Sequence, residues 1–177
     1  MVINIMRGRT FDKYETVAII GSFRKHYAEI CAAAGIFQDN GLKVLAPDIS
    51  KPKDPNAEFI ILESDTTDNP RDLEKAYLQK CLSAHAVYCF CKDGHTGAST
   101  MFELGFIAAS KQEVYFSELP NEPLIQAMIK DPEQIGSPEE IANRIMENNE
   151  LNKIAEAREC AGHAFFDADE GPEYFEL

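Results

Sequence analysis

The sequence predicts an α/β protein: an open, mostly parallel sheet of about five strands, with helices on both faces. Short apolar runs of strand length alternate with longer segments whose apolar residues recur three and four positions apart, the spacing of an amphipathic helix. The runs are continuously apolar, as in strands that are buried on both faces of a sheet. With 177 residues, 45% of them hydrophobic, the chain has enough apolar material for one core.

The first half of the chain predicts a strand, a helix, a strand and a long loop. The first apolar run stops at Gly21, as a buried strand does before a tight turn, and Asn40-Gly41 ends the amphipathic segment behind it. Pro47 closes the second strand, and the polar loop that follows carries three prolines. A short apolar run after this loop predicts either a strand or the first turn of a helix. After a polar lead-in over 1–15, these elements cover 17–20, 25–40, 42–46, 47–58 and 59–62.

The second half continues the alternation. A helical pattern leads into an apolar run, and a glycine-rich loop from Lys92 to Gly97 connects that run to the next helix. Right-handed crossovers place the carboxyl ends of parallel strands at one edge, where ligands bind, so the fold class is flavodoxin-like or Rossmann-like. The predicted helices cover 71–84, 99–110, 122–130 and 138–148, and the predicted strands cover 86–91 and 114–116.

Residues 1–150 are expected to form a single α/β domain, and residues 151–177 a C-terminal helix and acidic tail. The last fifteen residues, from His163, contain five acids and no Lys or Arg. We expect this tail to be partly disordered, or to dock through its aromatic side chains. These side chains are Phe165, Phe166, Tyr174 and Phe175.

The charge of the chain excludes several kinds of partner. Lys and Arg number 17 against 30 Asp and Glu, for a net charge of −13, and such a surface repels nucleic acid polymers and anionic membranes. An anionic ligand therefore needs a local site made of backbone amides or an arginine. No run approaches the roughly 18 apolar residues of a membrane helix, and the N-terminus does not resemble a secretory signal. Five cysteines without a CxxC pair predict a cytoplasmic protein with reduced thiols.

The turn after the first strand, Gly21-Ser22-Phe23-Arg24, is one candidate binding site. A glycine there lets backbone amides approach a ligand, the following helix N-terminus favours an anion, and Arg24 can contact a phosphate or carboxylate. The alternative is a plain strand–turn–helix junction in which Ser22 caps the helix. The turn is not a GxGxxG fingerprint, so it does not indicate a dinucleotide.

The loop around Gly94 to Gly105 is the second candidate site. Two glycines, two hydroxyls and a helix start make an oxyanion or phosphate cradle, and Glu103, placed in the first helical turn, can attack a sugar anomeric carbon or stabilise its oxocarbenium ion. The alternative is that Thr100-x-x-Glu103 is a capping box that needs no ligand. The candidate binding residues of this loop are Asp93, Gly94, His95, Gly97, Ser99 and Thr100.

Other polar residues give weaker signals. Asp48 and Asp65 each follow an apolar run and are candidates for binding ribose hydroxyls, with solvated loop acids as the alternative. Cys89 and Cys91 share one face of a strand, and small buried side chains are their expected role. A metal site needs more ligands at metal-like spacing, so we expect neither a metal nor an organic cofactor.

These motifs make the chain similar to the nucleoside 2-deoxyribosyltransferase superfamily over about residues 17–128. The resemblance rests on a strand that ends in Ile20-Gly21-Ser22-Phe23-Arg24, and on a strand over 87–90 whose glycine loop leads to Glu103-Leu104-Gly105-Phe106. A strand follows after a Lys-containing turn at Lys111. The chain most resembles the uncharacterised branch with a Gly-x-x-Gly-x-Ser-Thr-x-x-Glu loop.

The resemblance implies specific chemistry. In the characterised families the glutamate of this motif is the nucleophile that forms a deoxyribosyl-enzyme intermediate, a role that passes here to Glu103. Those families also use an aspartate in the helix before the motif strand. Counted back from His85, that position holds Tyr77, while Asp72 lies more than a turn earlier. Asp93 and His95 remain as alternative acids, and the resemblance also implies a homodimer or larger assembly.

Two functional hypotheses follow. The first is an enzyme, a transferase or hydrolase, that cleaves or exchanges the base at the N-glycosidic bond of a nucleoside or nucleotide, with a 5′-phosphate held where two helix N-termini converge. The second is a non-catalytic nucleotide-binding or sensing module that kept the pocket but lacks the family acid. A third, phosphoribohydrolase-like activity is disfavoured, because Lys92-Asp93-Gly94 stands where those enzymes have a Pro-Gly-Gly run.

Overall fold

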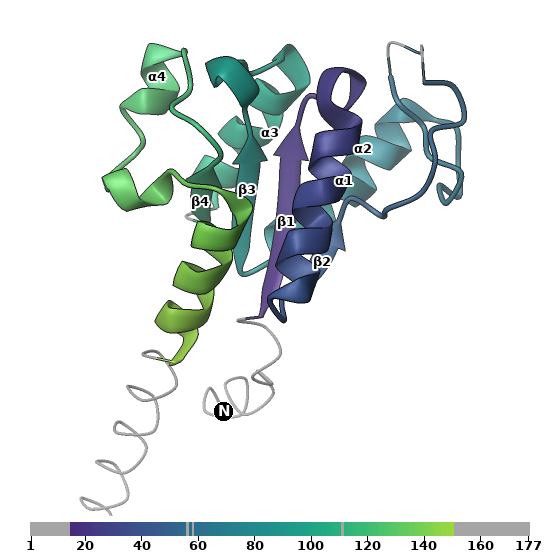
Figure 1. The fold of residues 1–177 in the computed structure, drawn as a ribbon. Coiled ribbons are helices and arrows are strands. Elements are labelled where there is room, and N and C mark those ends of the chain that lie inside the picture. The colour runs from purple at the N-terminus through teal and green to yellow at the C-terminus, as the bar shows by residue number, and fades with distance from the viewer. Residues whose placement is uncertain (1–14, 56, 58, 111, 151–177) are drawn as a thin grey trace, which may run out of the picture.

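The fold is an α/β sandwich around a parallel sheet, as the computed structural model shows for residues 15–55, 57, 59–110 and 112–150 (Figure 1). The sheet has four strands in the order β2-β1-β3-β4, and every neighbouring pair is parallel. The predicted fold class is confirmed, with four strands in place of about five. The strands are β1 (Thr16–Gly21), β2 (Lys43–Ala46), β3 (Ala86–Phe90) and β4 (Glu113–Phe116).

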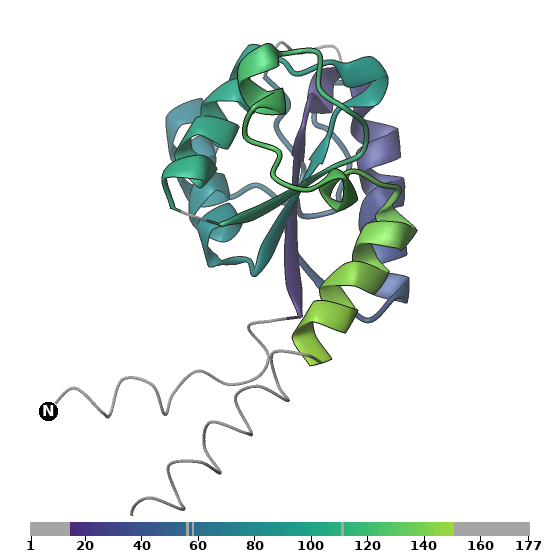
Figure 2. The same ribbon diagram turned by 90° about the vertical axis from the view of Figure 1, so that its left-hand side faces the viewer.

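Helices cover both faces of the sheet (Figure 2). One face packs against α1 (Phe23–Asp39) and against the helix over 138–150. The other face packs against α2 (Pro70–Ser83) and α3 (Ala98–Ala109). The remaining elements are short: η3 (Lys92–Gly94), α4 (Pro123–Gln126) and η4 (Pro132–Gln134).

Two hydrophobic clusters explain why the strands are continuous apolar runs in the sequence. Successive side chains of β1 point to opposite faces, so Val17 and Ile19 enter the cluster under α1, while Ala18 and Ile20 enter the one under α2 and α3. All four side chains are fully buried. Burial of each large aliphatic side chain contributes about 1.5–3 kcal/mol.

The fifth expected strand, the run at 59–62, does not join the sheet, and the edge of β4 lies beside the 3₁₀ turn η4. The side-chain amide of Gln134 donates to the Val114 carbonyl at 2.9 Å, and the Gly136 amide donates to the Phe116 carbonyl at 3.0 Å. Only a single bridge forms there, between Phe116 and Ile135.

Two further predictions of elements are wrong. The run at 59–62 forms neither a strand nor a helix turn, and only one antiparallel bridge joins its last residue, Leu62, to Pro52. The helix predicted over 122–130 is limited to α4, because the chain tightens into three-residue turns after Gln126 and is extended at Asp131, the residue before a proline.

The remaining predicted elements are present with small shifts at their ends, and the helix predicted over 138–148 runs over 138–150. The predictions for the lead-in and for the tail over 151–177 fall on residues 1–14 and 151–177, which lie outside the described residues. In the described part of the chain, no helix combines the length and apolar character that a bilayer crossing requires. The four cysteines found there, Cys31, Cys81, Cys89 and Cys91, are free thiols.

Candidate active site

A cavity of about 630 Å³ opens at the carboxyl edge of the sheet, where loops after β1, β2 and β3 meet α2. The strand order changes direction between β1 and β3, and ligands bind α/β sheets at such a switch point. Eleven of the residues predicted from the sequence line this cavity, and two do not. The eleven are Gly21, Ser22, Phe23, Arg24, Asp48, Asp65, His95, Gly97, Ser99, Thr100 and Glu103.

Asp93 and Gly94, the two that do not line the cavity, shape the loop that carries its neighbours. Both have positive φ, 56° and 70°. The side-chain amide of Asn121 donates to the Asp93 carbonyl and its backbone amide to the Gly94 carbonyl, each at 2.8 Å. A Cβ at Gly94 would lie 2.7 Å from the Asn121 side chain, so only glycine fits this close contact. These residues position His95 and Gly97.

In the turn after β1, the serine hydroxyl makes no hydrogen bond to the N-terminus of the helix. Ser22 occupies the N-cap of α1, but its side chain makes no capping hydrogen bond, so the predicted cap is wrong. Its carbonyl accepts from the amides of Lys25 and His26. Gly21 has a φ of 154°, and a Cβ there would lie 2.7 Å from the Phe90 carbonyl oxygen. The glycine therefore lets β1 end tightly against β3 and opens the space in front of α1.

The predicted capping box is also wrong, because α3 begins earlier than the box requires. Its N-cap is Gly97, which has no side-chain cap, and Thr100 lies inside the helix. Glu103 therefore lies in the second turn and not the first. The two uncapped helix N-termini are close: Ser22 Oγ lies 3.9 Å from the position of a Cβ on Gly97. Their amides give this end of the cavity a positive potential.

Glu103 is a carboxyl group buried without a partner. It is 3% exposed, lines the cavity, and its Oε2 atom has no hydrogen-bond partner. Burial, and secondly the charge of Glu74, raises its pKa from 4.5 to about 8. A buried unsatisfied carboxyl group destabilises the fold, so its presence in a cavity points to a function.

Glu74 is the site residue that the sequence analysis missed. It comes from α2, lines the same cavity as Glu103, and has a buried Oε1 atom with no hydrogen-bond partner. Burial raises the pKa of this half-buried carboxyl group. The family acid was sought at Tyr77, and Asp72, the other acid weighed, is exposed and does not line the cavity. The available signal was the spacing of 74 and 77, which puts both side chains on one helix face.

Tyr77 is anchored to the sheet. Its hydroxyl donates to the Ile19 carbonyl of β1 at 2.5 Å, and its ring packs edge-on against Phe23, with ring centroids 5.8 Å apart. Burial, with the nearby Cys81 and Glu103, raises the pKa of its hydroxyl well above 10. Tyr77 is therefore a neutral part of the cavity wall.

Cationic side chains surround the opening. Lys25 Nζ lies 3.0 Å from His95 Nε2, and Lys80 pairs with Asp48 at 2.5 Å. Arg24 is exposed and has no ion pair with any residue that the structure describes. Arg24 and Lys25 thus lie by the N-terminus of α1, while the third cation, Lys80 of α2, is held in an ion pair. The carboxyl groups of Glu74 and Glu103 enter the cavity from α2 and α3.

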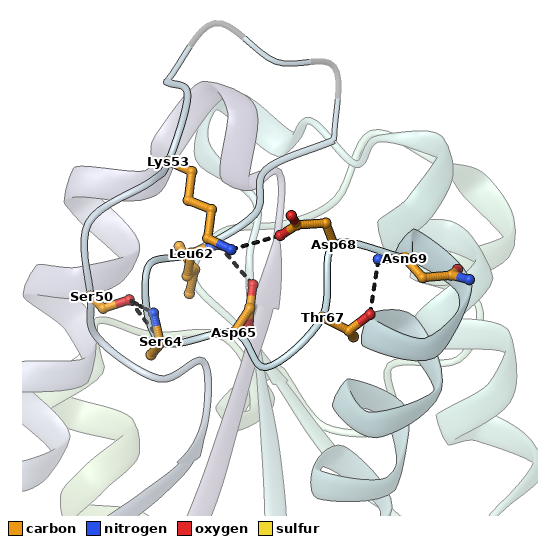
Figure 3. Close-up of polar contacts among 8 residues, drawn as sticks. All are labelled: Ser50, Lys53, Leu62, Ser64, Asp65, Thr67, Asp68 and Asn69. Carbon is orange, nitrogen blue, oxygen red and sulfur yellow. Dashed lines mark hydrogen bonds and ion pairs between the residues drawn. The ribbon is translucent and has the colours of Figure 1, made fainter.

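The segment between β2 and α2 forms one wall, and its own polar contacts hold it (Figure 3). Ser50 and Ser64 bond through their hydroxyls at 2.8 Å, and Lys53 pairs with Asp68 at 2.6 Å. Asp65, a candidate for binding ribose, uses Oδ2 to accept from the Leu62 amide at 2.7 Å. The apolar residues that this segment contributes to the cavity are Pro47, Phe59, Ile60 and Leu62.

No group of three or more metal-ligating side chains occurs among the described residues. Cys89 and Cys91 are fully buried in the cluster under α2 and α3, as predicted. The Cys91 thiol donates to the Glu118 carbonyl at 3.0 Å, and neither thiol lines the cavity.

Comparison with known proteins does not assign this site, because no family model, curated protein or solved structure matches the chain.

Proposed function

We propose that the protein cleaves the N-glycosidic bond of a nucleoside or nucleotide and passes the sugar to water or to a second base. The observation that carries this proposal is Glu103: a carboxyl group that is buried, lacks a hydrogen-bond partner and faces a cavity at the carboxyl edge of the sheet. The resemblance of the surrounding motif to nucleoside 2-deoxyribosyltransferases supports the same residue as nucleophile.

In the proposed reaction a Glu103 oxygen attacks C1′ of the sugar. The C1′–N bond breaks, its electron pair stays on the base nitrogen, and a glycosyl ester of Glu103 results. Water or a second base then attacks C1′ and releases the carboxylate. The transition state carries positive charge on the sugar, and a carboxylate in a dry cavity stabilises that charge far better than water does.

The free protein holds Glu103 mainly protonated. With a pKa of about 8, the protonated form predominates at pH 7. Attack requires the ionised form, so this proton must leave Glu103 before C1′ is attacked.

A 5′-phosphate suits the other end of the cavity. The uncapped N-termini of α1 and α3 offer backbone amides, and Arg24 and Lys25 line the same end. These groups are a local anion site on a chain of net charge −13. They favour a nucleotide over a nucleoside as the substrate.

The base fits the apolar wall. Phe59, Ile60 and Leu73 line the cavity between the β2–α2 segment and α2. A cavity of about 630 Å³ is in the range that encloses small organic ligands.

A non-catalytic nucleotide-binding module is the alternative, and Tyr77 in the place of the family acid favours it. In that case Glu103 would contact the ribose and no bond would break.

We further propose that the protein acts in the cytoplasm on a small molecule, and that it self-associates through the outer face of α3. Phe102 and Phe106 are 56% and 49% exposed there, with their rings 6.1 Å apart. The only charged residue of α3, Glu103, is buried on its other face. A face without charge supports contact between two copies of an acidic chain, because it brings no carboxylates together.

The test combines binding and turnover. Nucleosides, deoxynucleosides and their 5′-monophosphates are screened by thermal shift, and each ligand that raises Tm is analysed by chromatography for released base. Released base that disappears in Glu103→Ala and persists in Asp72→Asn, an exposed acid of α2, supports the enzyme. A ligand recovered intact supports the binding module, and no shift with any nucleotide refutes both.

A further inference from the structure

The proposed cleavage needs a proton as well as a nucleophile, because a purine or pyrimidine leaves poorly as an anion. General acid catalysis by a positioned side chain contributes typically 10²- to 10⁴-fold. We propose that Glu74 is the catalytic acid–base of this protein: its carboxyl group protonates the departing base and later takes a proton from the attacking water. This inference rests on the proposed function and adds a residue to it.

Glu74 lines the same cavity as Glu103. Glu103 reaches the cavity from α3 and Glu74 from α2, and the residue beside it, Leu73, belongs to the apolar wall that suits a base. Both carboxyl groups have one buried oxygen without a hydrogen-bond partner. Two such oxygens in one cavity leave room for a substrate to supply the missing contacts.

The other acids are occupied or misplaced. Asp48 pairs with Lys80, and Asp65 accepts from the Leu62 amide. Asp72 and Asp93 do not line the cavity.

The two remaining candidates lack a suitable proton. The Tyr77 hydroxyl donates to the Ile19 carbonyl and holds its proton well above pH 10. His95 Nε2 lies 3.0 Å from Lys25 Nζ, and an ammonium group can only donate, so this nitrogen accepts the hydrogen bond and has no proton to give.

The two carboxyl groups ionise one after the other. Burial and the charge of Glu74 raise the pKa of Glu103 to about 8, and burial raises the pKa of Glu74, so over an intermediate pH range the pair holds a single proton. The other titratable groups that face them are Tyr77 and Cys81 from α2 and Cys89 from β3. Burial raises the pKa of Tyr77 and Cys81, and the hydrogen bond with Cys91, followed by burial, raises that of Cys89, so all three stay neutral in this range.

The protons then balance over the whole reaction. The shared proton moves to Glu74 as Glu103 becomes the carboxylate that attacks C1′. When the C1′–N bond breaks, Glu74 gives this proton to the base nitrogen. In the second half Glu74 takes a proton from water, the hydroxide oxygen bonds to C1′, and the ester electrons return to Glu103. The net reaction is hydrolysis, with one water consumed.

The experiment compares leaving groups in the Glu74→Gln variant of the full chain. One substrate carries the base that the wild-type protein releases, and the other carries 4-nitrophenolate on the same sugar, which leaves without a proton. We expect kcat to fall about 10²- to 10⁴-fold for the base and less than tenfold for 4-nitrophenolate. Equal losses for both substrates, or no loss for the base, would overturn the assignment.

The pH profile gives a second readout that a structural role would not change. Wild-type kcat/KM should be bell-shaped, since the pair must carry exactly one proton, whereas Glu74→Gln with 4-nitrophenolate should lose the basic limb and rise to a plateau. A retained basic limb would refute the role of Glu74. Asp72→Asn is the matched control, and Glu74→Asp, which keeps the acid, should retain more activity on the base than Glu74→Gln if both fold to the same Tm.

The two proposals fail differently. Glu103→Ala should lose activity on both substrates, because 4-nitrophenolate still needs the nucleophile. If Glu103→Ala stays active on both, the proposed function is wrong. If only the Glu74 results fail, the acid assignment is wrong while the nucleophile stands.

Discussion

Replacement of Glu103 by glutamine should make the protein more stable in alkaline solution. The variant keeps the shape of the side chain and removes its titration. Above pH 4.5 the unfolded chain releases the Glu103 proton, whereas the folded protein keeps it until about pH 8. In this window the unfolded state binds fewer protons at Glu103, so the contribution of Glu103 to stability falls as pH rises and becomes constant above about pH 8.

The size of this effect follows from the pKa shift. A rise from 4.5 to about 8 corresponds to about 5 kcal/mol as an upper limit, at 1.36 kcal/mol for each pH unit. The glutamine amide leaves buried polar atoms without partners, which costs about 1–3 kcal/mol at every pH. The variant should therefore be near or below the wild type in stability at pH 5 and clearly above it at pH 9.

Urea unfolding of both proteins at pH 5, 6, 7, 8 and 9 measures the difference. We expect the free energy of unfolding of Glu103→Gln, minus that of the wild type, to rise with pH and to level off near pH 8. Asp72→Asn, an exposed acid, should give a flat difference. A difference for Glu103→Gln that changes by less than about 1 kcal/mol over this range would refute a proton held by burial.

Three further predictions test other parts of the molecule. Arg24→Ala should raise KM for a nucleoside 5′-monophosphate about tenfold, the effect of about 1.4 kcal/mol, and leave KM for the nucleoside unchanged; equal changes would contradict a phosphate contact. Phe102→Asp should convert a dimer of the protein to a monomer, as measured by light scattering. Leu124→Asp, on the exposed side of α4, should leave the dimer intact. A monomeric wild type would refute the α3 contact. Gly21→Ala should lower the free energy of unfolding by several kcal/mol, because the new Cβ would lie 2.7 Å from a carbonyl oxygen of β3. Gly35→Ala in α1, with open space around it, should raise the free energy of unfolding by about 1 kcal/mol. Urea unfolding measures both variants, and equal effects would be inconsistent with the close contact at Gly21.

The strands and the main helices could be predicted because local sequence decides them. Val17 to Ile20 is buried on both faces, and a continuous apolar run records that directly. The structure of the segment that packs beside β4 could not be predicted in the same way. Whether that edge receives a strand or a 3₁₀ turn depends on how Gln134 reaches Val114, which is a tertiary contact.

The loops that form the candidate site could be predicted from the sequence, but the pairing of its carboxyl groups could not. Gly21 and Gly97 mark the two turns that face the cavity, and both lie near the ends of predicted strands or helices. The spacing of 74 and 77 places Glu74 on the helix face of Tyr77, but its interaction with Glu103 joins two helices that are distant in sequence, and local spacing does not show that pairing. The capping box at Thr100 matched its pattern but failed, because a pattern does not fix the residue at which a helix begins.

The turn that covers β4 also limits how this protein can recognise peptides or aggregate. An extended segment that joins a sheet needs a row of free hydrogen-bonding groups along the outermost strand. The carbonyl groups of Val114 and Phe116, which such a segment would use, already accept from Gln134 and Gly136. On this side the sheet cannot be extended by strand addition from an amyloid-like segment or a peptide ligand, and contacts made there must be through side chains.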